Sequence, residues 1–315
     1  MKELYIDTNA AGQRIDRYLL KRFPRASKGF LQKMLRKKQI TLNQGRAQPQ
    51  AFLNEGDCIQ VFFSDETIDH FSGTDQRVPK PPMPPNNTLF NRPVYEDEHI
   101  LVLNKPHGLL TQPDASGEPA LSDWLSTAIK NDGGTFHPAP SNRLDKNTSG
   151  IIMIPKDYPT QKLVNTAIRS RSILKEYLAL VKGTIAPSLT LQDQLVKDGA
   201  TNRVTIGAGE EGVSAHLSCV RIASNQDTSL VRIRLFTGRA HQIRVQLAAA
   251  NHPIIGDPKY GNRTVNKAFL ERYGLRRQLL HSVHYAIPDL NYDFKAPLPQ
   301  DFQSILKDLG YTEVD

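Results

Sequence analysis

The 315-residue chain has few cysteines and no long apolar run. Its two cysteines, Cys58 and Cys219, lie far apart and follow no metal-ligand spacing, so we expect neither a disulfide framework nor a zinc or other metal site. No stretch reaches the roughly 18 apolar residues that a membrane helix needs, and the first residues contain no apolar signal region. We therefore expect a soluble, cytosolic (cytoplasmic) protein with no membrane partner.

Cofactor motifs are also missing. The chain has no Walker loop, no His-x-x-x-His, no Cys/His cluster and no Gly-x-Ser-x-Gly elbow. Residues 207–212 fit the GxGxxG pattern, but Glu210 and Glu211 would repel a phosphate. A strand pattern follows at 213–222, where a dinucleotide site would need a helix. We therefore reject that site and expect no cofactor, so the chemistry must be done by side chains alone.

Positive charge is abundant and concentrated near the start of the chain. The net charge is +8, and through residue 62 twelve lysines and arginines face five acids, which is nearly the whole excess. Helical spacing predicts a short helix over 13–23, and Ser27 is a suitable N-cap for a second helix to about Lys37. One face of this second helix is apolar and the other cationic. A solvated helix face explains such a charge run as well as nucleic-acid binding does.

Strand signals at 40–42 and 59–63, with a turn at 43–45, predict a small hairpin-rich sheet next to these helices. The order of Arg14-x-Asp16, a basic helix after Ser27, Ile40-Thr41-Leu42-Asn43 and Glu55-Gly56-Asp57 resembles the RNA-binding module named after the small-subunit ribosomal protein "S-four". The resemblance implies a small α/β module that lies along RNA phosphates. The RNA-binding residues that it implies are Arg14, Lys28, Lys33, Arg36, Lys37 and Asn43.

A proline-rich segment follows this module. Residues 78–87 contain five prolines, which predicts an extended spacer that packs as neither helix nor sheet. We predict an RNA-binding domain over 1–63, a linker over 64–90 and a second domain over 91–315. The second domain shows many strands, few helices and no βαβ rhythm. This pattern predicts an α+β fold with a mixed, mostly antiparallel central sheet flanked by helices.

The loop of residues 142–150 is the centre of the second domain. Its Arg143 and Asp145 precede an apolar run at 151–154 that predicts a buried strand, and loops next to core strands often contain functional residues. The alternative is an Arg/Asp pair that only closes a turn.

Three residues further along complete the set of candidates. The strand pattern at 175–183 places Tyr177 either in the core or at a pocket. Arg239 lies at a glycine corner between a predicted strand and a predicted helix. His281 is interpreted as a structural histidine.

Several motifs together resemble the large-subunit rRNA pseudouridine synthase family, which pairs an S-four module with a catalytic domain. They follow the family order over nearly the whole chain: Glu96-Asp97 to Pro106-x-Gly108, Arg143-Leu144-Asp145 with Thr148-Ser149-Gly150, Lys175-x-Tyr177-x-Ala179-x-Val181-x-Gly183, and Gly238-Arg239-x-His241-Gln242-Ile243-Arg244 through His252-Pro253-Ile254-x-Gly256-Asp257. One departure is Asn142, where many members carry histidine. We interpret it as a subgroup difference and not as a loss of activity.

The resemblance implies an isomerase that detaches uracil from its sugar, turns it and rejoins it through carbon five, with no metal, redox change or energy source. It implies Asp145 as the catalytic carboxylate, kept ionised by Arg239. Tyr177 would stack on the uracil and help to remove the proton from carbon five. Arg143 would help to lever the nucleotide out of its helix. Asp145 could attack the sugar or abstract a sugar proton, and the sequence leaves both open.

The implied partner is RNA, with rRNA as the first candidate and tRNA as the alternative, and we expect a monomer. A non-catalytic RNA-binding or ribosome-assembly factor would explain the basic N-terminal module equally well. It gives no reason why Asp145, Tyr177 and Arg239 fit one catalytic pattern. A glycoside hydrolase would need two carboxylates that flank the bond, and the chain offers one strong candidate.

Overall fold

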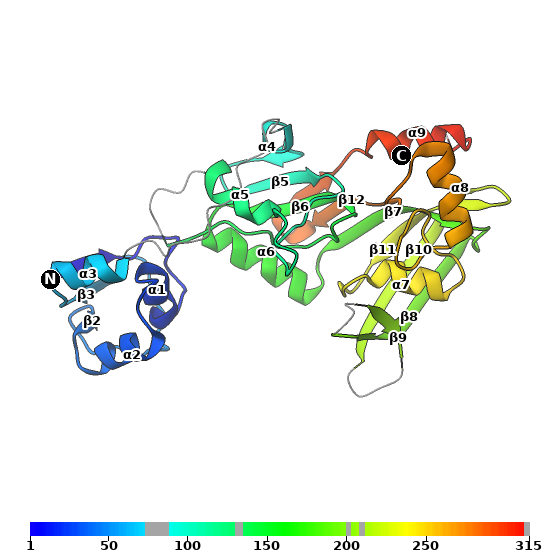
Figure 1. Cartoon of the computed structure of the whole chain (residues 1–315). Helices are drawn as coiled ribbons and strands as arrows, with labels where there is room; N and C mark the ends of the chain where they lie inside the picture. The colour runs from blue at the N-terminus through cyan, green and yellow to red at the C-terminus, as the bar shows by residue number, and fades with distance from the viewer. Residues whose placement is uncertain (73–87, 130–134, 200–202, 208–211, 312–315) are drawn as a thin grey trace. The chain divides into compact units, whose positions relative to one another are not determined.

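The computed structural model describes residues 1–72, 88–129, 135–199, 203–207 and 212–311 (Figure 1). The chain divides into two compact units. The first comprises Met1–Pro84, Asp123–Ala139 and Pro155–Lys162, and the second comprises Pro85–Ser122, Pro140–Ile154 and Leu163–Asp315. Within the described ranges, no helix is both long and apolar enough to cross a membrane.

The first unit is built on a three-stranded antiparallel sheet with the strand order β1-β3-β2. Its N-terminal elements are β1 (Lys2–Tyr5), α1 (Ile15–Arg22), α2 (Lys28–Arg36), β2 (Ile40–Leu42), β3 (Cys58–Val61) and α3 (Asp65–Ser72). The predicted cap of α2 is confirmed, because the Phe30 N–H donates to Ser27 Oγ at 3.2 Å. Leu31 and Leu35 of α2 are fully buried in the unit's core. The amphipathic pattern therefore orients this helix as predicted.

The predicted linker begins too early. Helix α3 occupies 65–72, and its Ile68 is only 3% exposed in the core of the first unit. The ring of Phe71 lies 4.8 Å from that of Phe30, measured between centroids. Because Ile68 and Phe71 are three residues apart, they share one apolar face of a helix. The proline-rich stretch at 78–87 lies outside the described residues.

The first unit also includes chain from far beyond residue 90. The backbone N–H of Tyr158 donates to Asn9 Oδ1 at 3.1 Å, and the Tyr158 hydroxyl donates to the Gly12 carbonyl at 3.3 Å. A boundary drawn from composition alone cannot anticipate such long-range bonds. The assignment of RNA binding and catalysis to separate domains stays a prediction.

The second unit contains a sheet in which ten described strands take part, in the order β4-β5-β6-β12-β7-β11-β10-β8-β9, with β13 on β12. Most pairs are antiparallel, and β12 and β6 are parallel. The predicted α+β class with a mixed, mostly antiparallel sheet is confirmed. The strands are β4 (Tyr95–Glu96), β5 (Ile100–Lys105), β6 (Ser149–Pro155), β7 (Leu174–Lys182), β8 (Ser188–Lys197), β9 (Val204–Ile206), β10 (Val213–Ser224), β11 (Thr228–Leu235), β12 (Leu280–Ile287) and β13 (Tyr292–Lys295).

Helices accompany this sheet. They are α4 (Thr88–Asn91), α5 (Leu121–Ala128), α6 (Tyr158–Ser170), α7 (Gln242–Ala249), α8 (Arg263–Tyr273) and α9 (Gln300–Asp308), with a 3₁₀ turn at Pro288–Leu290; α5, α6 and the end of β6 run from one unit into the other. Helix α7 packs near β8 and β9 (Figure 1). Strand β9 ends before 208–211, which lie outside the described residues, and β10 follows, so a strand and not a helix comes after the rejected GxGxxG pattern.

Glycine at position 150 allows β6 to approach β12 closely. Gly150 has φ +120°, and a Cβ atom there would lie 2.2 Å from the carbonyl oxygen of Ser282. Since no side chain fits at that distance, only glycine permits this parallel pairing. This close pairing places the segment before Gly150, residues 142–149, where β6 and β12 meet.

Candidate active site

The loop that carries Asp145 is fixed by hydrogen bonds at both ends. The Leu144 N–H donates to Thr111 Oγ1 at 3.2 Å, and the Thr111 hydroxyl donates back to the Leu144 carbonyl at 2.9 Å. The Thr148 N–H donates to the Asp145 carbonyl at 3.0 Å and closes a turn. The backbone around Asp145 is therefore held in one conformation, and its carboxylate projects from it.

A fully buried lysine supports the same loop. Lys105 Nζ donates to the carbonyls of Pro106, Leu109 and Lys146, at 2.9, 2.8 and 3.2 Å. Burial lowers the pKa of Lys105 to about 7, although the nearby charge of Asp145 acts in the opposite direction. Lys105 therefore hydrogen-bonds the backbone carbonyl of Lys146, the residue next to Asp145.

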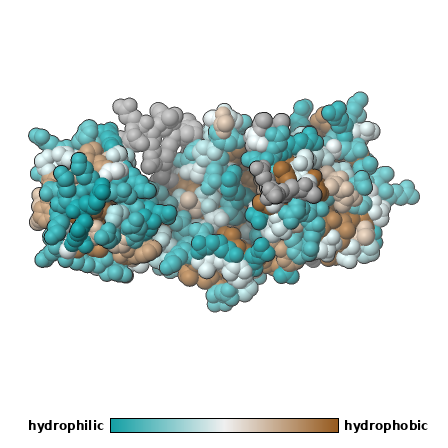
Figure 2. Space-filling view, turned by 90° about the horizontal axis from the view of Figure 1, so that it is seen from below, coloured by the Kyte–Doolittle hydropathy of each residue, from teal (hydrophilic) through white to brown (hydrophobic). Residues whose placement is uncertain are grey.

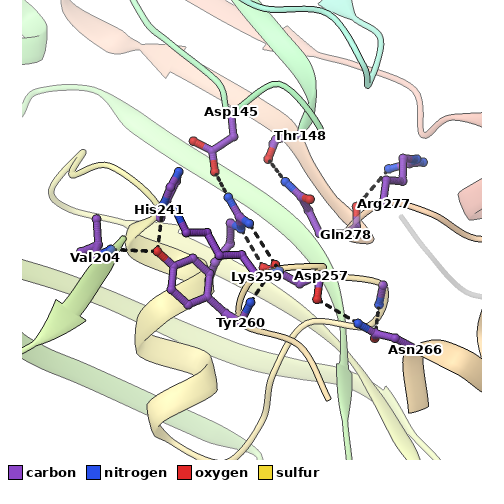
Figure 3. Close-up of polar contacts among 12 residues, drawn as sticks. Asp145, Thr148, Val204, His241, Asp257, Lys259, Tyr260, Asn266, Arg277 and Gln278 are labelled. Carbon is purple, nitrogen blue, oxygen red and sulfur yellow. Dashed lines mark hydrogen bonds and ion pairs between the residues drawn. The ribbon is translucent and has the colours of Figure 1, made fainter. Parts of the chain in front are cut away.

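Asp145 pairs with Arg244, and Arg244 also pairs with Asp257. Figure 3 labels the two carboxylates. Arg244 Nη1 lies 2.7 Å from Asp145 Oδ2. On its other side the guanidinium donates to both Asp257 oxygens, from Nε at 2.7 Å and from Nη2 at 2.9 Å. The side chains of Asp257, Arg244 and Asp145 are 0%, 7% and 27% exposed. The chain of charges thus runs from a buried carboxylate to one that solvent and substrate can reach.

Electrostatic interactions favour the charged forms of Asp257 and Arg244, the two buried residues of this chain of charges. Burial alone would raise the pKa of Asp257, but the bonds and charge of Arg244, with backbone N–H groups of Lys259 and Tyr260, lower it overall. Burial likewise disfavours the Arg244 guanidinium, yet Asp257 and Asp145 raise its pKa. Arg244 therefore stays a fixed cation beside Asp145.

The expectation that Arg239 pairs with Asp145 is wrong. Arg239 is exposed, and its Nε donates to the Ser214 carbonyl at 3.1 Å. Arg239 precedes α7, whereas Arg244 lies inside it, where Gln242 to Leu247 are all buried. The signal available in the sequence was an arginine among buried helix positions, because a buried charge requires a partner. Asp257 is that partner, and it also accepts the backbone N–H groups of Lys259 and Tyr260 in a turn.

Tyr177 is buried and still lines the pocket. Its side chain is 5% exposed, and its hydroxyl lies 3.0 Å from that of Tyr285. Burial, followed by the neighbouring Tyr285, raises the pKa of Tyr177 well above its ordinary value. The hydroxyl is therefore protonated at neutral pH, so its ring is better suited to stacking than its oxygen is to acting as a base. Tyr177 therefore lies in the core and also lines the pocket, so each of the two positions predicted for it is partly correct.

His241 is a further polar group of the pocket, beyond the predicted site residues. Its Nδ1 lies 2.9 Å from the Tyr260 hydroxyl, which accepts the Val204 N–H at 3.0 Å (Figure 3). This contact holds the orientation of the His241 ring through Nδ1. Burial lowers the pKa of His241, although the charge of Asp145 opposes it. The ring is therefore neutral at pH 7.

These groups surround one pocket of about 300 Å³, at the lower end of the range for small-molecule sites. Its polar lining includes Arg143, Asp145, Lys175, Arg239, His241 and Arg244, and its apolar lining includes Leu144, Ile168, Leu235, Ile243 and Leu280. The structure thus brings Arg143, Asp145, Tyr177 and Arg239 to one place. His281 does not line it, and Ser149 Oγ lies 2.9 Å from its Nδ1, consistent with the structural interpretation.

The predicted RNA-binding residues of the first unit divide into two groups. Lys28, Lys33, Arg36 and Lys37 are exposed and make no ion pair with any described residue. Figure 2 shows a largely hydrophilic surface over this unit, at the left. Arg14 and Asn43 are occupied within the protein. Arg14 forms two bonds to Asp16, at 3.1 and 2.7 Å.

Asn43 is engaged in a turn. Its Nδ2 donates to Asp57 Oδ1 at 2.8 Å, and its Oδ1 accepts the Cys58 N–H at 2.8 Å. Its own backbone has φ +49°, which asparagine tolerates better than most residues. The structure thus gives Asn43 a defined role in the loop, and contact with RNA stays a prediction for it.

Comparison with known proteins agrees with this arrangement. A family model described as "RNA pseudouridylate synthase" matches residues 99–249, which include Asp145, Tyr177 and Arg244. Ribosomal large subunit pseudouridine synthase D of Zymomonas mobilis is 30% identical over 94% of this chain and 93% of its own length. Ribosomal large subunit pseudouridine synthase C of Pasteurella multocida is 29% identical over 97% and 93%.

The fold has solved counterparts. The structure of human RNA Pseudouridylate Synthase Domain Containing 4 matches with a TM-score of 0.61 and 24% identity, over 71% of this chain and 95% of that one. The matching family model and the 30% identical relative define an RNA pseudouridine synthase, and the chain is therefore an isomerase. It belongs to the family of ribosomal large subunit pseudouridine synthases, as the motifs predicted.

Proposed function

We propose that this enzyme converts uridines of large-subunit ribosomal RNA to pseudouridine, with Asp145 as the catalytic carboxylate. The observation that carries the proposal is the contact of Asp145 with Arg244 inside a pocket that Tyr177 also lines. The printed names of the curated relatives support rRNA as the substrate. Transfer RNA is the alternative substrate.

The reaction is an isomerisation whose atoms balance within the substrate. The bond between uracil N1 and ribose C1′ breaks, a bond forms between C5 and C1′, the proton on C5 is lost and N1 gains one. Asp145 takes part either by attacking C1′ or by removing a ribose proton, and both routes require an ionised carboxylate. Arg244 supplies a fixed positive charge for that carboxylate, and it needs no rearrangement during the reaction.

The remaining pocket residues act on the substrate. Tyr177 offers a ring on which the uracil stacks. Arg143 is exposed beside Asp145 and assists extrusion of the nucleotide, a step that costs a few kcal/mol. Arg239, free of Asp145, is placed at the pocket to contact a substrate phosphate. Each of these roles requires RNA in the pocket.

The exposed cations of α2 contact phosphates away from the reacting nucleotide. Lys28, Lys33, Arg36 and Lys37 provide affinity that depends little on sequence and falls with salt. Since ribosomal RNA is the proposed substrate, the cytoplasm is the proposed location.

Release of tritium tests the reaction directly. RNA that carries tritium on uracil C5 is incubated with the protein, and only isomerisation replaces that hydrogen by the bond to C1′. We expect release by the wild-type protein and none by Asp145→Asn, which should still bind RNA. Binding without release by the wild type would favour an RNA-binding assembly factor. Mapping pseudouridines in rRNA and tRNA from cells that lack the protein identifies the substrate.

A further inference from the structure

Strand β6 leaves part of its edge uncovered by β12. The two strands pair only through Ser149 and Gly150 of β6, and β12 then pairs with β7 and β13. The next residues of β6, including Ile151 and Met153, are fully buried. Their backbone groups therefore need partners other than water.

Asn142 and its neighbour supply those partners. Asn142 Nδ2 donates to the Ile151 carbonyl at 2.9 Å, and Asn142 Oδ1 accepts the Met153 N–H at 2.9 Å. The Ser141 N–H donates to the Met153 carbonyl at 2.8 Å. One side-chain amide thus continues the ladder of β6, because it offers a donor and an acceptor at the same time.

This amide lies three residues before Asp145 and lines the same pocket. Tyr285 lines this pocket as well, and its hydroxyl lies 3.0 Å from that of Tyr177. Asn142 therefore bonds the strand that fixes the Asp145 loop and shares the pocket lining with the tyrosine pair that includes the proposed stacking ring.

We propose that Asn142 is a positioning residue for the reaction: its amide fixes the Asp145 loop on β6 through one donated and one accepted bond, and so sets the distance between Asp145 and Tyr177. The inference rests on the proposed function, since it concerns how that pocket is assembled. It predicts that any side chain at 142 supports turnover only while it offers a donor and an acceptor in the same arrangement.

Two substitutions test this requirement in opposite directions. In Asn142→His, a neutral imidazole has one N–H and one bare nitrogen separated by a single carbon, as in the amide. The imidazolium has two donors, so the Met153 N–H loses its acceptor. In Asn142→Asp the neutral acid has a donor and an acceptor, whereas the carboxylate only accepts, so the Ile151 carbonyl loses its donor.

The measurement is the single-turnover rate at saturating RNA, expressed as the ratio of variant to wild type at each pH between about 5 and 8.5. We expect the Asn142→His ratio to fall as pH decreases through the imidazole pKa, ordinarily about 6.5. The Asn142→Asp ratio should fall as pH increases, because burial moves a carboxyl pKa upward into this range. Asn142→Leu should lose about tenfold or more at every pH. The ratio cancels contributions from the titratable and charged groups of the pocket that each variant shares with the wild type, such as Lys175, Tyr177, Tyr285 and Asp145.

Asn104 provides the matched control. Its amide donates to the Pro297 carbonyl at 2.8 Å in the same unit, and it does not line the pocket. Asn104→His and Asn104→Asp should give flat ratios. Thermal unfolding of each variant identifies any variant that fails to fold. For a variant that folds, the change of its rate ratio with pH still tests the proposal.

The outcomes separate the two claims. If the wild type releases no tritium, the proposed function fails. If the wild type is active and both Asn142 ratios are flat or change in the same direction, the positioning role of Asn142 is wrong.

Discussion

The two units use positive charge in opposite ways. In the first unit, Lys28, Lys33, Arg36 and Lys37 extend into water from α2 and pair with no described residue. In the second, Arg244 is 7% exposed and contacts two carboxylates. Charges in water are screened by salt, whereas buried pairs are screened much less. Under the proposed function, α2 would provide affinity for a polyanion and Arg244 would provide fixed geometry for the chemistry.

The largest expected effect follows from removing Asp145, the one carboxylate among the described residues that line the pocket. Asp145→Asn keeps the shape of the side chain but removes its charge, so we expect turnover to fall below detection. Affinity for RNA should change by less than about threefold, because phosphate contacts dominate binding. Tritium release and a binding titration measure the two quantities. Turnover within about tenfold of wild type would show that another group performs the chemistry.

Asp257→Asn is expected to have the next largest effect, on both stability and rate. It leaves the buried Arg244 guanidinium with Asp145 as its only carboxylate, and breaking a buried pair costs about 3–5 kcal/mol. Denaturant unfolding and single-turnover rates measure the two losses.

Asp301→Asn is the matched control for Asp257→Asn. It breaks a two-bond pair with the buried Arg277, at 2.9 and 2.7 Å, away from the pocket. We expect it to lower stability while the rate is retained. If both variants reduce the rate equally, the loss reflects general destabilisation and not the Arg244 geometry.

Neutralising α2 should weaken binding without slowing the chemistry. Replacement of Lys28, Lys33, Arg36 and Lys37 by glutamine should reduce the slope of log affinity against log salt by about 3, at roughly 0.7–0.9 per lost phosphate contact. The rate at saturating RNA should be unchanged.

Four exposed cations of the second unit provide the control for α2: Arg263, Lys267, Lys295 and Lys307. The same replacement there lowers net charge equally. An equal change in slope for both sets would mean that net charge, and not the position of α2, determines affinity.

The smallest expected effect concerns His241. Tyr260→Phe removes the hydroxyl that contacts His241 Nδ1 and holds the ring in place, so we expect the single-turnover rate to fall only a few-fold, by about 1 kcal/mol, the worth of one hydrogen bond. Tyr273→Phe, which removes a hydroxyl bonded to Asp308 away from the pocket, should leave the rate unchanged. A larger loss for Tyr273→Phe would exclude this role of Tyr260.

Local signals in the sequence were sufficient for most of the elements. Ser27 predicted the start of α2, and alternating residues predicted the strand of Tyr177. Helix α8 was missed although Asn262 caps its start and Gly274 its end, because none of its side chains is fully buried and its apolar face is weak. Helix α3 was missed because the proline-rich segment after it led us to predict a linker that begins at residue 64.

The site was predictable in composition but not in its pairing. The loop motif identified Asp145, but the choice between Arg239 and Arg244 depends on where α7 begins and which way its residues face. Asp257 reaches Arg244 from a turn eight residues after α7 ends, and such contacts have no periodic signature. Asn142 was recognised only as a departure from a motif, since its role depends on where β12 leaves β6.

The direct test compares Arg244→Gln with Arg239→Gln in single-turnover rate at saturating RNA. A buried, paired guanidinium beside the proposed catalytic carboxylate predicts a loss of about 10³-fold or more for Arg244→Gln, comparable to the removal of a preorganised transition-state contact. Arg239→Gln should lose far less and should act mainly on affinity. Equal losses, or a greater loss for Arg239→Gln, would contradict the assignment of Arg244 as the cation that holds Asp145 for catalysis.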